Sequence, residues 1–115
     1  MKQPSVPKLI WDALDAGETA QRFSEGKTFE DYETNQMFHD AVERNLIIVG
    51  EALAQMRRHH PEVAHRIPSV ADIVAFRNIL VHGYDVVEDA TVWTTLRDDV
   101  PLLIEVLRDL LAELG

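Results

Sequence analysis

Four polar side chains in one eight-residue segment could share a chemical task. Residues 77–84 read Arg-Asn-Ile-Leu-Val-His-Gly-Tyr and end an apolar, helix-forming stretch. Helical spacing places Arg77 close in angle to Tyr84 and makes Asn78 and His82 an i, i+4 pair. A helix that gives these positions to polar groups rather than to core residues is usually holding them for a site. The residue types suit the cleavage of a phosphodiester bond.

Cleavage of RNA without a metal needs a base for the 2'-hydroxyl, an acid for the leaving oxygen and fixed positive charge for the phosphorane. His82 can supply the first two, because an imidazole titrates near neutral pH. Arg77 can hold a phosphate through two parallel hydrogen bonds. Asn78 could orient His82 or contact phosphate, and Tyr84 could donate a proton or stack on a base. A two-fold dimer that joins two His82 side chains would complete an acid and base pair.

Each of these residues also has an ordinary structural interpretation. Arg77 could bridge Asp72 or Asp85, His82 could be favoured at a helix C-terminus by the helix dipole, and Tyr84 could be a half-buried anchor. For any one residue taken alone, the structural role is the more common one. Their combination at this spacing favours a site.

The charge of the chain argues against nucleic-acid binding over its whole surface. The chain has 115 residues, 46% of them hydrophobic, and a formal net charge of -9 at pH 7. Phosphate affinity comes mainly from Lys and Arg. The only net-positive part is residues 57–84, which contain Arg77, Arg57–His60, His65 and Arg66. This basic cluster could steer an anion toward the site if the fold brings the two together, or it could be a solvated charge run at a helix end.

Other chemistries lack their residues. The chain has no cysteine, which excludes a disulfide framework, a thiolate zinc site and a thiol nucleophile. The spacing of Glu62 and His65 is that of a di-iron ligand pair, but a di-iron bundle needs two such pairs and two further carboxylates. No nucleophile elbow or phosphate-binding glycine loop occurs. We therefore expect no metal and no cofactor. Without a membrane-length apolar run or a secretory signal, we expect a soluble cytoplasmic protein with no membrane partner.

Helical spacing of apolar residues recurs in every long segment, which predicts an all-α fold. A first helix should begin at Ser5 and Pro7 and be punctuated near Gly26. Its apolar positions are Leu9, Ile10, Ala13, Leu14, Ala20 and Phe23. A long second helix is expected from about Glu30 to Arg57. It carries one apolar stripe of Phe38, Val42, Leu46, Val49, Leu53 and Met56, and another of Met37, Ala41, Ile48 and Ala52.

The two stripes cover about half of this helix, more than one neighbour would fill. Either the helix is central to its own bundle or one stripe forms a subunit interface. Gly50 would allow another backbone to approach closely. Glu51 is expected to be a surface or ion-pair residue beside Arg44, with a role in the site as the lesser alternative.

The remaining signals complete a bundle. Pro61 should open a short helix, and Ser69 with Asp72 resembles a capping box at the start of a third helix that ends at Gly83. Its core positions are Ile73, Val74, Phe76 and Leu80. A fourth helix should begin at Asp89 and be kinked by Pro101. Its seam is Trp93, Leu96, Val100, Leu103, Leu107, Leu110 and Leu114. The prediction is a single domain, residues 1–115, folded as an up-and-down bundle of four main helices plus a short helix.

The polar segment resembles the signature of the HEPN superfamily (higher eukaryotes and prokaryotes nucleotide-binding), which is Arg, four to six residues, His, any residue and Tyr. Arg77, His82 and Tyr84 match it, and Asn78 is the polar residue that often follows the arginine.

The likeness extends beyond this motif. Residues 46–52, Leu-Ile-Ile-Val-Gly-Glu-Ala, are similar to the Ile-Gly-Glu-Ala segment of HepT-like toxins. Val92-Trp93 and Asp99-Val100-Pro101 are similar to their last helix. The resemblance therefore covers essentially the whole chain, and the expected fold is the HEPN fold.

The resemblance implies a metal-independent endoribonuclease, the toxin of a type II-like or type VII toxin-antitoxin module. It implies a homodimer with both motifs facing one cleft, in which Arg77, His82 and Asn78 are catalytic and Arg77 and Tyr84 bind RNA. The expected partner is a minimal nucleotidyltransferase antitoxin, which in this family can adenylylate the motif tyrosine, here Tyr84. The alternative is a non-catalytic helical dimer that binds a nucleotidyltransferase or a nucleotide, which the acidic composition favours mildly.

Overall fold

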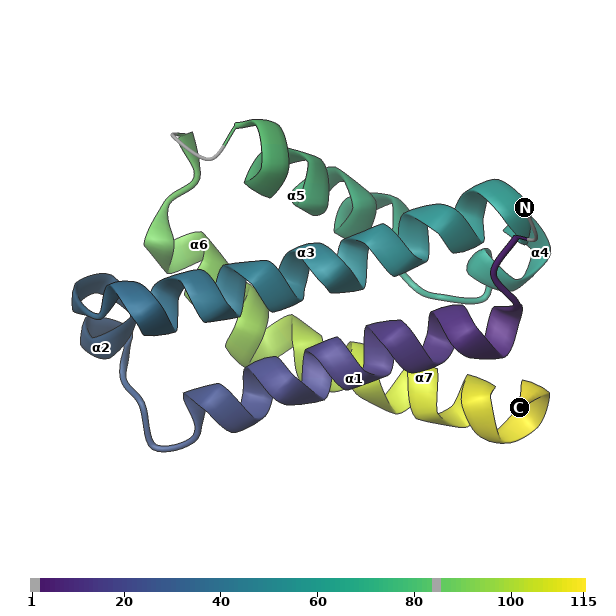
Figure 1. Cartoon of the computed structure of the whole chain (residues 1–115), viewed down its shortest axis with the longest axis horizontal. Coiled ribbons are helices and arrows are strands. Elements are labelled where there is room, and N and C mark those ends of the chain that lie inside the picture. The colour runs from purple at the N-terminus through teal and green to yellow at the C-terminus, as the bar shows by residue number, and fades with distance from the viewer. Residues whose placement is uncertain (1–2, 84–85) are drawn as a thin grey trace.

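The computed structural model describes residues 3–83 and 86–115, which form helices joined by short connections (Figure 1). No strand occurs in these two ranges, so the predicted all-α class is confirmed. No helix within them has the length and hydropathy to cross a membrane. The elements are α1 (Val6–Ser24), α2 (Phe29–Thr34), α3 (Gln36–His59), α4 (Pro61–Ala64), α5 (Val70–His82), α6 (Asp89–Thr94), the π-helix η2 (Thr95–Asp99) and α7 (Val100–Leu114).

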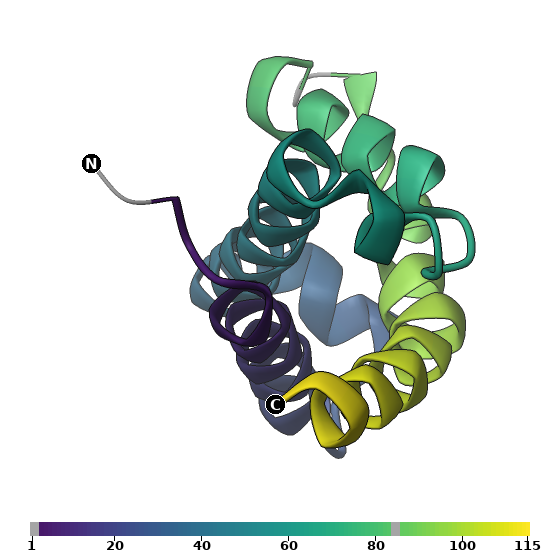
Figure 2. The ribbon, with the colours of Figure 1, turned by 90° about the vertical axis from the view of Figure 1, so that its right-hand side faces the viewer.

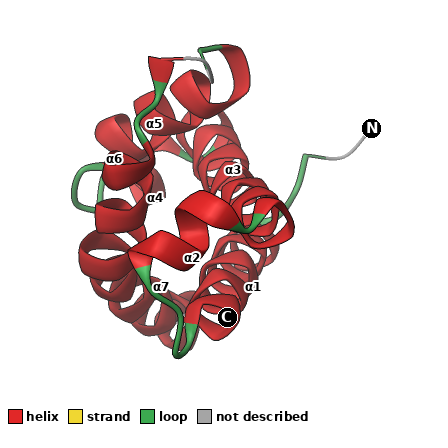
Figure 3. Ribbon diagram, turned by 90° about the vertical axis from the view of Figure 1, so that its left-hand side faces the viewer, coloured by secondary structure: helices red, strands yellow, loops and turns green. Residues whose placement is uncertain are grey.

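The four long units are α1, α3, α5 and the continuous run of α6, η2 and α7. Helix α1 packs against α3 and α7, and α5 packs against α3. Seen end-on, the long helices surround a common interior (Figure 2). Helix α2 lies across one end of this bundle, where it contacts α3 and α6 (Figure 3). The expected up-and-down bundle of four main helices is therefore confirmed.

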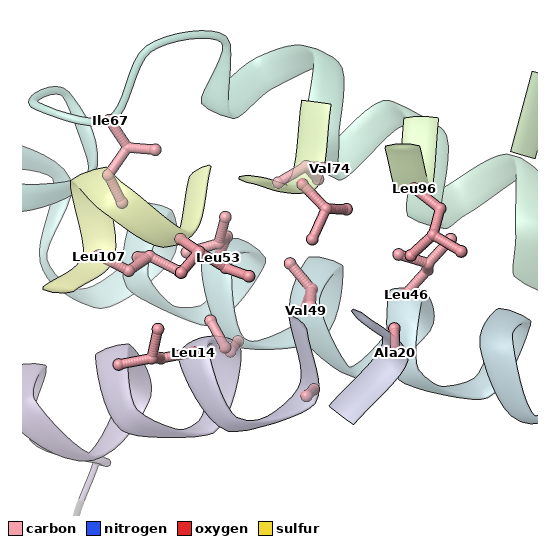
Figure 4. Packing of buried hydrophobic residues seen from close by; sticks show 14 of the residues in the cluster. Leu14, Ala20, Leu46, Val49, Leu53, Ile67, Val74, Leu96 and Leu107 are labelled. Carbon is pink, nitrogen blue, oxygen red and sulfur yellow. The ribbon is translucent and has the colours of Figure 1, made fainter. Parts of the chain in front are cut away.

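The interior is apolar, and each long helix contributes to it (Figure 4). The first stripe of α3 is buried along its whole length, as predicted. Phe23, an expected core position, is 45% exposed, so that expectation is wrong, and Met37 of the second stripe is 84% exposed, so it is not part of the core of this bundle. Both lie near the end of the bundle that α2 closes, beyond the neighbours that would cover them.

The expected second helix is divided at Asn35. The Asn35 carboxamide accepts a hydrogen bond from the Phe38 N–H at 3.1 Å, so it caps α3. A capping box between Thr28 and Asp31 begins the separate helix α2. The break turns Tyr32 into the interior, where none of its surface is exposed. Capping satisfies the free N–H groups that the break leaves at the start of α3.

The start of α5 also differs from the expectation. Ser69 has φ 61° and ψ 25°, in the left-handed region, and its side chain makes no capping hydrogen bond. The predicted capping box with Asp72 is therefore wrong, because this backbone conformation does not direct the Ser69 hydroxyl at the first helical N–H groups. The C-terminal end of α5 is as expected: the Gly83 N–H donates to the Ile79 carbonyl at 2.7 Å, and the helix ends there.

The last helical run contains the irregularity expected near Pro101, but its form is a π-helical turn, η2. Pro101 is the second residue of α7, so its missing N–H falls directly after the π-helical turn, where the hydrogen-bond pattern of the run changes. Glu88, not Asp89, occupies the N-cap position of α6, and it makes no capping bond through its side chain. The Asp89 carboxylate is instead directed to His39 of α3.

Candidate active site

Helix α5 carries three of the four predicted site residues. Arg77 and Asn78 lie in its second half and His82 is its last residue. After α4 the chain reverses, so α5 runs back along α3 (Figure 1). Tyr84 lies outside the described residues, and so do its expected contacts.

Arg77 is held where α5 comes closest to α3. A Cβ atom added at Gly50 would lie 2.7 Å from the Arg77 Cγ and closer still to its Cβ. Only a glycine leaves room for the arginine stem at this distance. The close approach predicted at Gly50 is therefore present, and the group that approaches is the motif arginine.

Two neighbours hold the Arg77 guanidinium. Its Nη1 donates to the Asn78 Oδ1 at 2.7 Å, and its Nε lies 3.6 Å from the Glu51 Oε1. The latter separation is too long for a hydrogen bond, and Nε has no other partner in the described part of the chain. Because the Arg77 side chain is only 15% exposed, the outer edge of the guanidinium is the part that a phosphate could reach.

This arrangement corrects two expectations. Among the described residues, the carboxylate near Arg77 belongs to Glu51, on another helix, and not to Asp72. Asp85, the other expected partner, lies outside the described residues. Glu51 is an exposed ion-pair residue, one of its expected roles, but its partner is Arg77 rather than Arg44. Its sequence signals were its position next to Gly50 and its place in residues 46–52, one of the segments that carry the family resemblance.

His82 is placed differently from Arg77. It is exposed at the end of α5, and its imidazole makes no hydrogen bond within residues 3–83 and 86–115. Five residues of helix separate it from Arg77, an axial rise of about 7.5 Å. The chain therefore presents a fixed guanidinium and a free imidazole on one helix, without a hydrogen bond between them.

The basic cluster lies away from His82. Arg57 and Arg58 are at the C-terminal end of α3, and Arg66 pairs with Glu113 at 2.6 Å. His60 contacts the Pro4 carbonyl at 3.0 Å. All of them precede the start of α5, whereas His82 is at its other end, so the fold does not bring the cluster to the imidazole.

Two hollows flank the α3–α5 contact. A polar groove of 370 Å³ lies between α1 and α3 and includes Asp12, Asp15 and Glu51. An apolar groove of 640 Å³ lies between α5 and the η2–α7 run and includes Phe76 and Leu103. No group of three or more His, Asp or Glu side chains among the described residues is arranged to hold a metal ion.

A second polar cluster, which no sequence motif marked, surrounds His39. Its Nε2 lies 3.0 Å from both the Asp89 Oδ1 and the Glu43 Oε2, and its Nδ1 lies 3.1 Å from the Asp40 Oδ1. The ring stacks on Tyr32 with centroids 4.6 Å apart. The cluster joins α2, α3 and the start of α6.

Burial and charge in this cluster shift the pKa values of its residues. Partial burial by itself lowers the pKa of His39, but hydrogen bonds to Asp40 and Asp89 outweigh it and raise that pKa above 6.5. Burial raises the pKa of Glu43 and that of the Tyr32 phenol. The imidazole therefore takes up a proton more readily here than in free solution, and the Glu43 carboxyl and the Tyr32 phenol release theirs less readily.

Comparison with known proteins adds an independent line of evidence. The family model described as "Ribonuclease HepT-like" matches residues 13–110. A Methanocaldococcus jannaschii protein named as an RNase is 28% identical over 101 residues, 88% of this chain and 92% of its own. A Thermococcus cleftensis protein named "Probable ribonuclease HepT" is 31% identical over 96 residues, 80% of this chain and 83% of its own. No solved structure matches significantly.

The matched region includes α3 and α5, and therefore Gly50, Arg77 and His82. The bundle, the motif on α5 and the relatives agree with one another. The chain accordingly belongs to the HepT-like ribonucleases of the HEPN superfamily.

Proposed function

We propose that the protein cleaves RNA without a metal ion, as the toxin of a toxin-antitoxin module, and that Arg77, Asn78 and His82 form its active site. The observation that carries this proposal is the contrast on α5 between a fixed guanidinium and a free imidazole. A fixed cation can stabilise the charge that develops on a phosphorane without reorganising during the reaction. A free imidazole can reach and exchange protons.

Arg77 is the phosphate-binding group in this proposal. Its stem rests on Gly50 and its Nη1 is bonded to Asn78, so the guanidinium is oriented before substrate arrives. Orientation in advance lowers the entropic cost of reaching the transition state. Asn78 therefore acts first on Arg77, a more specific role than those that the sequence left open.

His82 is the proton-transfer group. Attack by the 2'-hydroxyl releases one proton and departure of the 5'-oxygen takes one up, so the reaction uses a base and an acid. One described chain offers one imidazole on this part of α5. The same imidazole can accept the first proton and donate it to the 5'-oxygen, and a homodimer would bring two such imidazoles to one cleft.

Control by a partner completes the proposal. A minimal nucleotidyltransferase antitoxin would neutralise the toxin by adenylylating Tyr84, which adds bulk and negative charge two residues from His82. Negative charge there would repel the RNA phosphate. The proposed setting is the cytoplasm, where RNA and such a partner would both be present.

The alternative is a dimer that binds a nucleotidyltransferase or a nucleotide and cleaves nothing. The net charge of -9 favours it, because an acidic surface repels RNA.

The test is RNA cleavage by the purified protein in EDTA, compared with His82→Ala and Arg77→Ala variants. His65→Ala is a matched control, because His65 is also exposed and follows α4, away from the site. We expect chelator-resistant cleavage by the wild type and the control, and loss of cleavage in the other two. Equal residual cleavage by all four proteins would support the alternative.

A further inference from the structure

One face of α3 is left uncovered by α1 and α5. Along it, exposed and half-exposed residues recur with helical spacing, and we call this face the α3 seam. Its residues are Met37, Asp40, Ala41, Arg44, Ile47, Ile48, Glu51, Ala54, Gln55 and Arg58. Steps of three and four residues are those of a surface that packs against another helix.

The seam is complementary to itself. Its centre is apolar, at Ile47 and Ile48. Three residues before Ile47 is Arg44, and three residues after Ile48 is Glu51. A rotation of 180° about the centre therefore places each arginine opposite a glutamate.

The outer positions follow the same symmetry. The rotation sets Ala41 against Ala54, which permits close approach, and Met37 against Arg58, whose stem can cover the exposed methionine. No residue meets a like charge in these pairs. A face with charges placed for solubility alone would have no reason to show this symmetry.

We propose that the α3 seam is the interface at which a second copy of this chain docks, with the two α3 helices antiparallel. Arg44 of one protomer pairs with Glu51 of its partner, twice. Arg44 is exposed and makes no ion pair in the described part of the chain. Glu51 is 48% exposed, and its Oε1 lies 3.6 Å from the Arg77 Nε, which is too long for a hydrogen bond, so the carboxylate can still accept hydrogen bonds from a partner.

This docking completes the site, and in that respect it rests on the proposed function. Arg77 is level with Gly50. Since α5 runs antiparallel to α3 with the same rise, His82 is level with about residue 45 of α3. The two-fold rotation about Ile47 and Ile48 carries residue 45 to residue 50 of the partner. Each His82 is thereby brought level, along the helix axes, with the Arg77 of the other protomer, and one Arg44–Glu51 pair lies within about one residue of the level of each site.

The test is a charge exchange read by sedimentation or light scattering at micromolar concentration. In a dimer of Arg44→Glu, the substituted position faces Glu51 of the partner, so two carboxylates meet at each end of the seam. In a dimer of Glu51→Arg, the substituted position faces Arg44 of the partner, so two guanidinium groups meet there. Like charges across an interface are costly, so each variant should dimerise at least about tenfold more weakly than the wild type. Mixed together, the two variants should form a heterodimer, because every pair is then of opposite charge.

The controls lie off the seam. Arg57→Glu reverses a charge on the same helix, and Glu105→Arg reverses an exposed charge on α7. Both should dimerise as the wild type does, and circular dichroism should show that all four variants are folded. Single variants that dimerise normally, or a mixture that does not recover dimers, would overturn the proposed pairing.

A crosslink provides a second reading that does not depend on charge. The chain has no cysteine, so Ile48→Cys introduces a single thiol that can form a disulfide only between chains. Mild oxidation should give a covalent dimer from this variant and not from Leu102→Cys on α7, where Leu102 is 64% exposed. A covalent dimer from Leu102→Cys and none from Ile48→Cys would contradict docking through the α3 seam.

Failure of this inference is separable from failure of the proposed function. A wild type that is dimeric and cleaves RNA, but whose seam variants behave normally, has its interface elsewhere. If the wild type dimerises through the seam but cleaves RNA no better than His82→Ala, the proposed interface is supported and the proposed activity is contradicted. A monomeric wild type would contradict both the seam and the symmetric cleft.

Discussion

Two histidines at different places in this bundle show how position decides what an imidazole does. His39 is 21% exposed, lies within hydrogen-bond distance of Asp40 and Asp89, and stacks on Tyr32. His82 is exposed at the end of α5, with no hydrogen-bond partner in the described ranges. The first is held among carboxylates, whose hydrogen bonds raise its pKa. The second is exposed, so a substrate can reach it, as it must reach a general acid or base.

The largest effect should come from the free imidazole. We expect His82→Ala to lower RNA cleavage by about 10²–10⁴-fold, the usual contribution of a general acid or base. Its melting temperature should stay close to that of the wild type, because the side chain is exposed and makes no described hydrogen bond. A steady-state cleavage assay beside a thermal melt measures both. Loss of stability with retained cleavage would reverse the roles assigned to the two histidines.

The next largest effect should come from the support beneath Arg77. Gly50→Ala places a methyl group 2.7 Å from the Arg77 Cγ and forces α5 away from α3. Overpacking of this kind costs about 1–3 kcal/mol in the free energy of unfolding, and the displaced guanidinium should also lower cleavage. Urea denaturation measures the first effect, with Gly17→Ala as the control, since the nearest atom to an added Cβ there is 3.5 Å away. Equal stability of the two variants would show that the contact at Gly50 is loose.

His39→Ala should affect stability and spare cleavage. Removing the imidazole leaves Asp40 and Asp89 without their shared hydrogen-bond donor, at a cost of about 1–2 kcal/mol. Cleavage at a temperature where the variant is folded should be close to that of the wild type, with His65→Ala as the matched control.

The contribution of His39 to stability should also depend on pH. The pKa of His39 is raised above 6.5 in the folded chain, so folding favours the protonated form. Its contribution to stability is fully present below about pH 6.5 and is lost as the pH rises through the folded pKa. Urea midpoints of the wild type should therefore fall as the pH is raised above about 6.5, and those of His39→Ala should change less. Parallel curves for the two proteins would remove His39 as the cause.

The smallest effect should come from the ring on which His39 stacks. The Tyr32 hydroxyl is buried and has no hydrogen-bond partner among the described residues. Tyr32→Phe removes this group without altering the ring, so we expect stability to be unchanged or increased by up to about 1 kcal/mol. A loss of more than about 1 kcal/mol in a thermal melt would indicate that the hydroxyl is bonded in solution.

Local signals predicted most of the fold. Ser5 caps α1 and Gly83 ends α5, because each acts on the few residues beside it. The break at Asn35 was missed because asparagine is tolerated within helices as well as at caps. Packing decides the matter there: Tyr32 is buried only if α2 turns across the end of the bundle.

The site was predictable only where it lies on one helix. Arg77, Asn78 and His82 share α5, and their spacing was enough to group them. Glu51 lies on α3, and no spacing rule connects it to a residue so distant in the sequence. The same limit applied to the basic cluster, whose distance from His82 depends on the direction in which α5 runs.

The most direct test of the account mixes two inactive proteins. Arg77→Ala and His82→Ala should each fail to cleave RNA in EDTA. If each site takes its arginine from one protomer and its histidine from the other, a mixed dimer contains one intact site, and the mixture should recover up to about a quarter of wild-type cleavage under random pairing. A mixture that forms heterodimers and still leaves RNA intact would contradict the shared site.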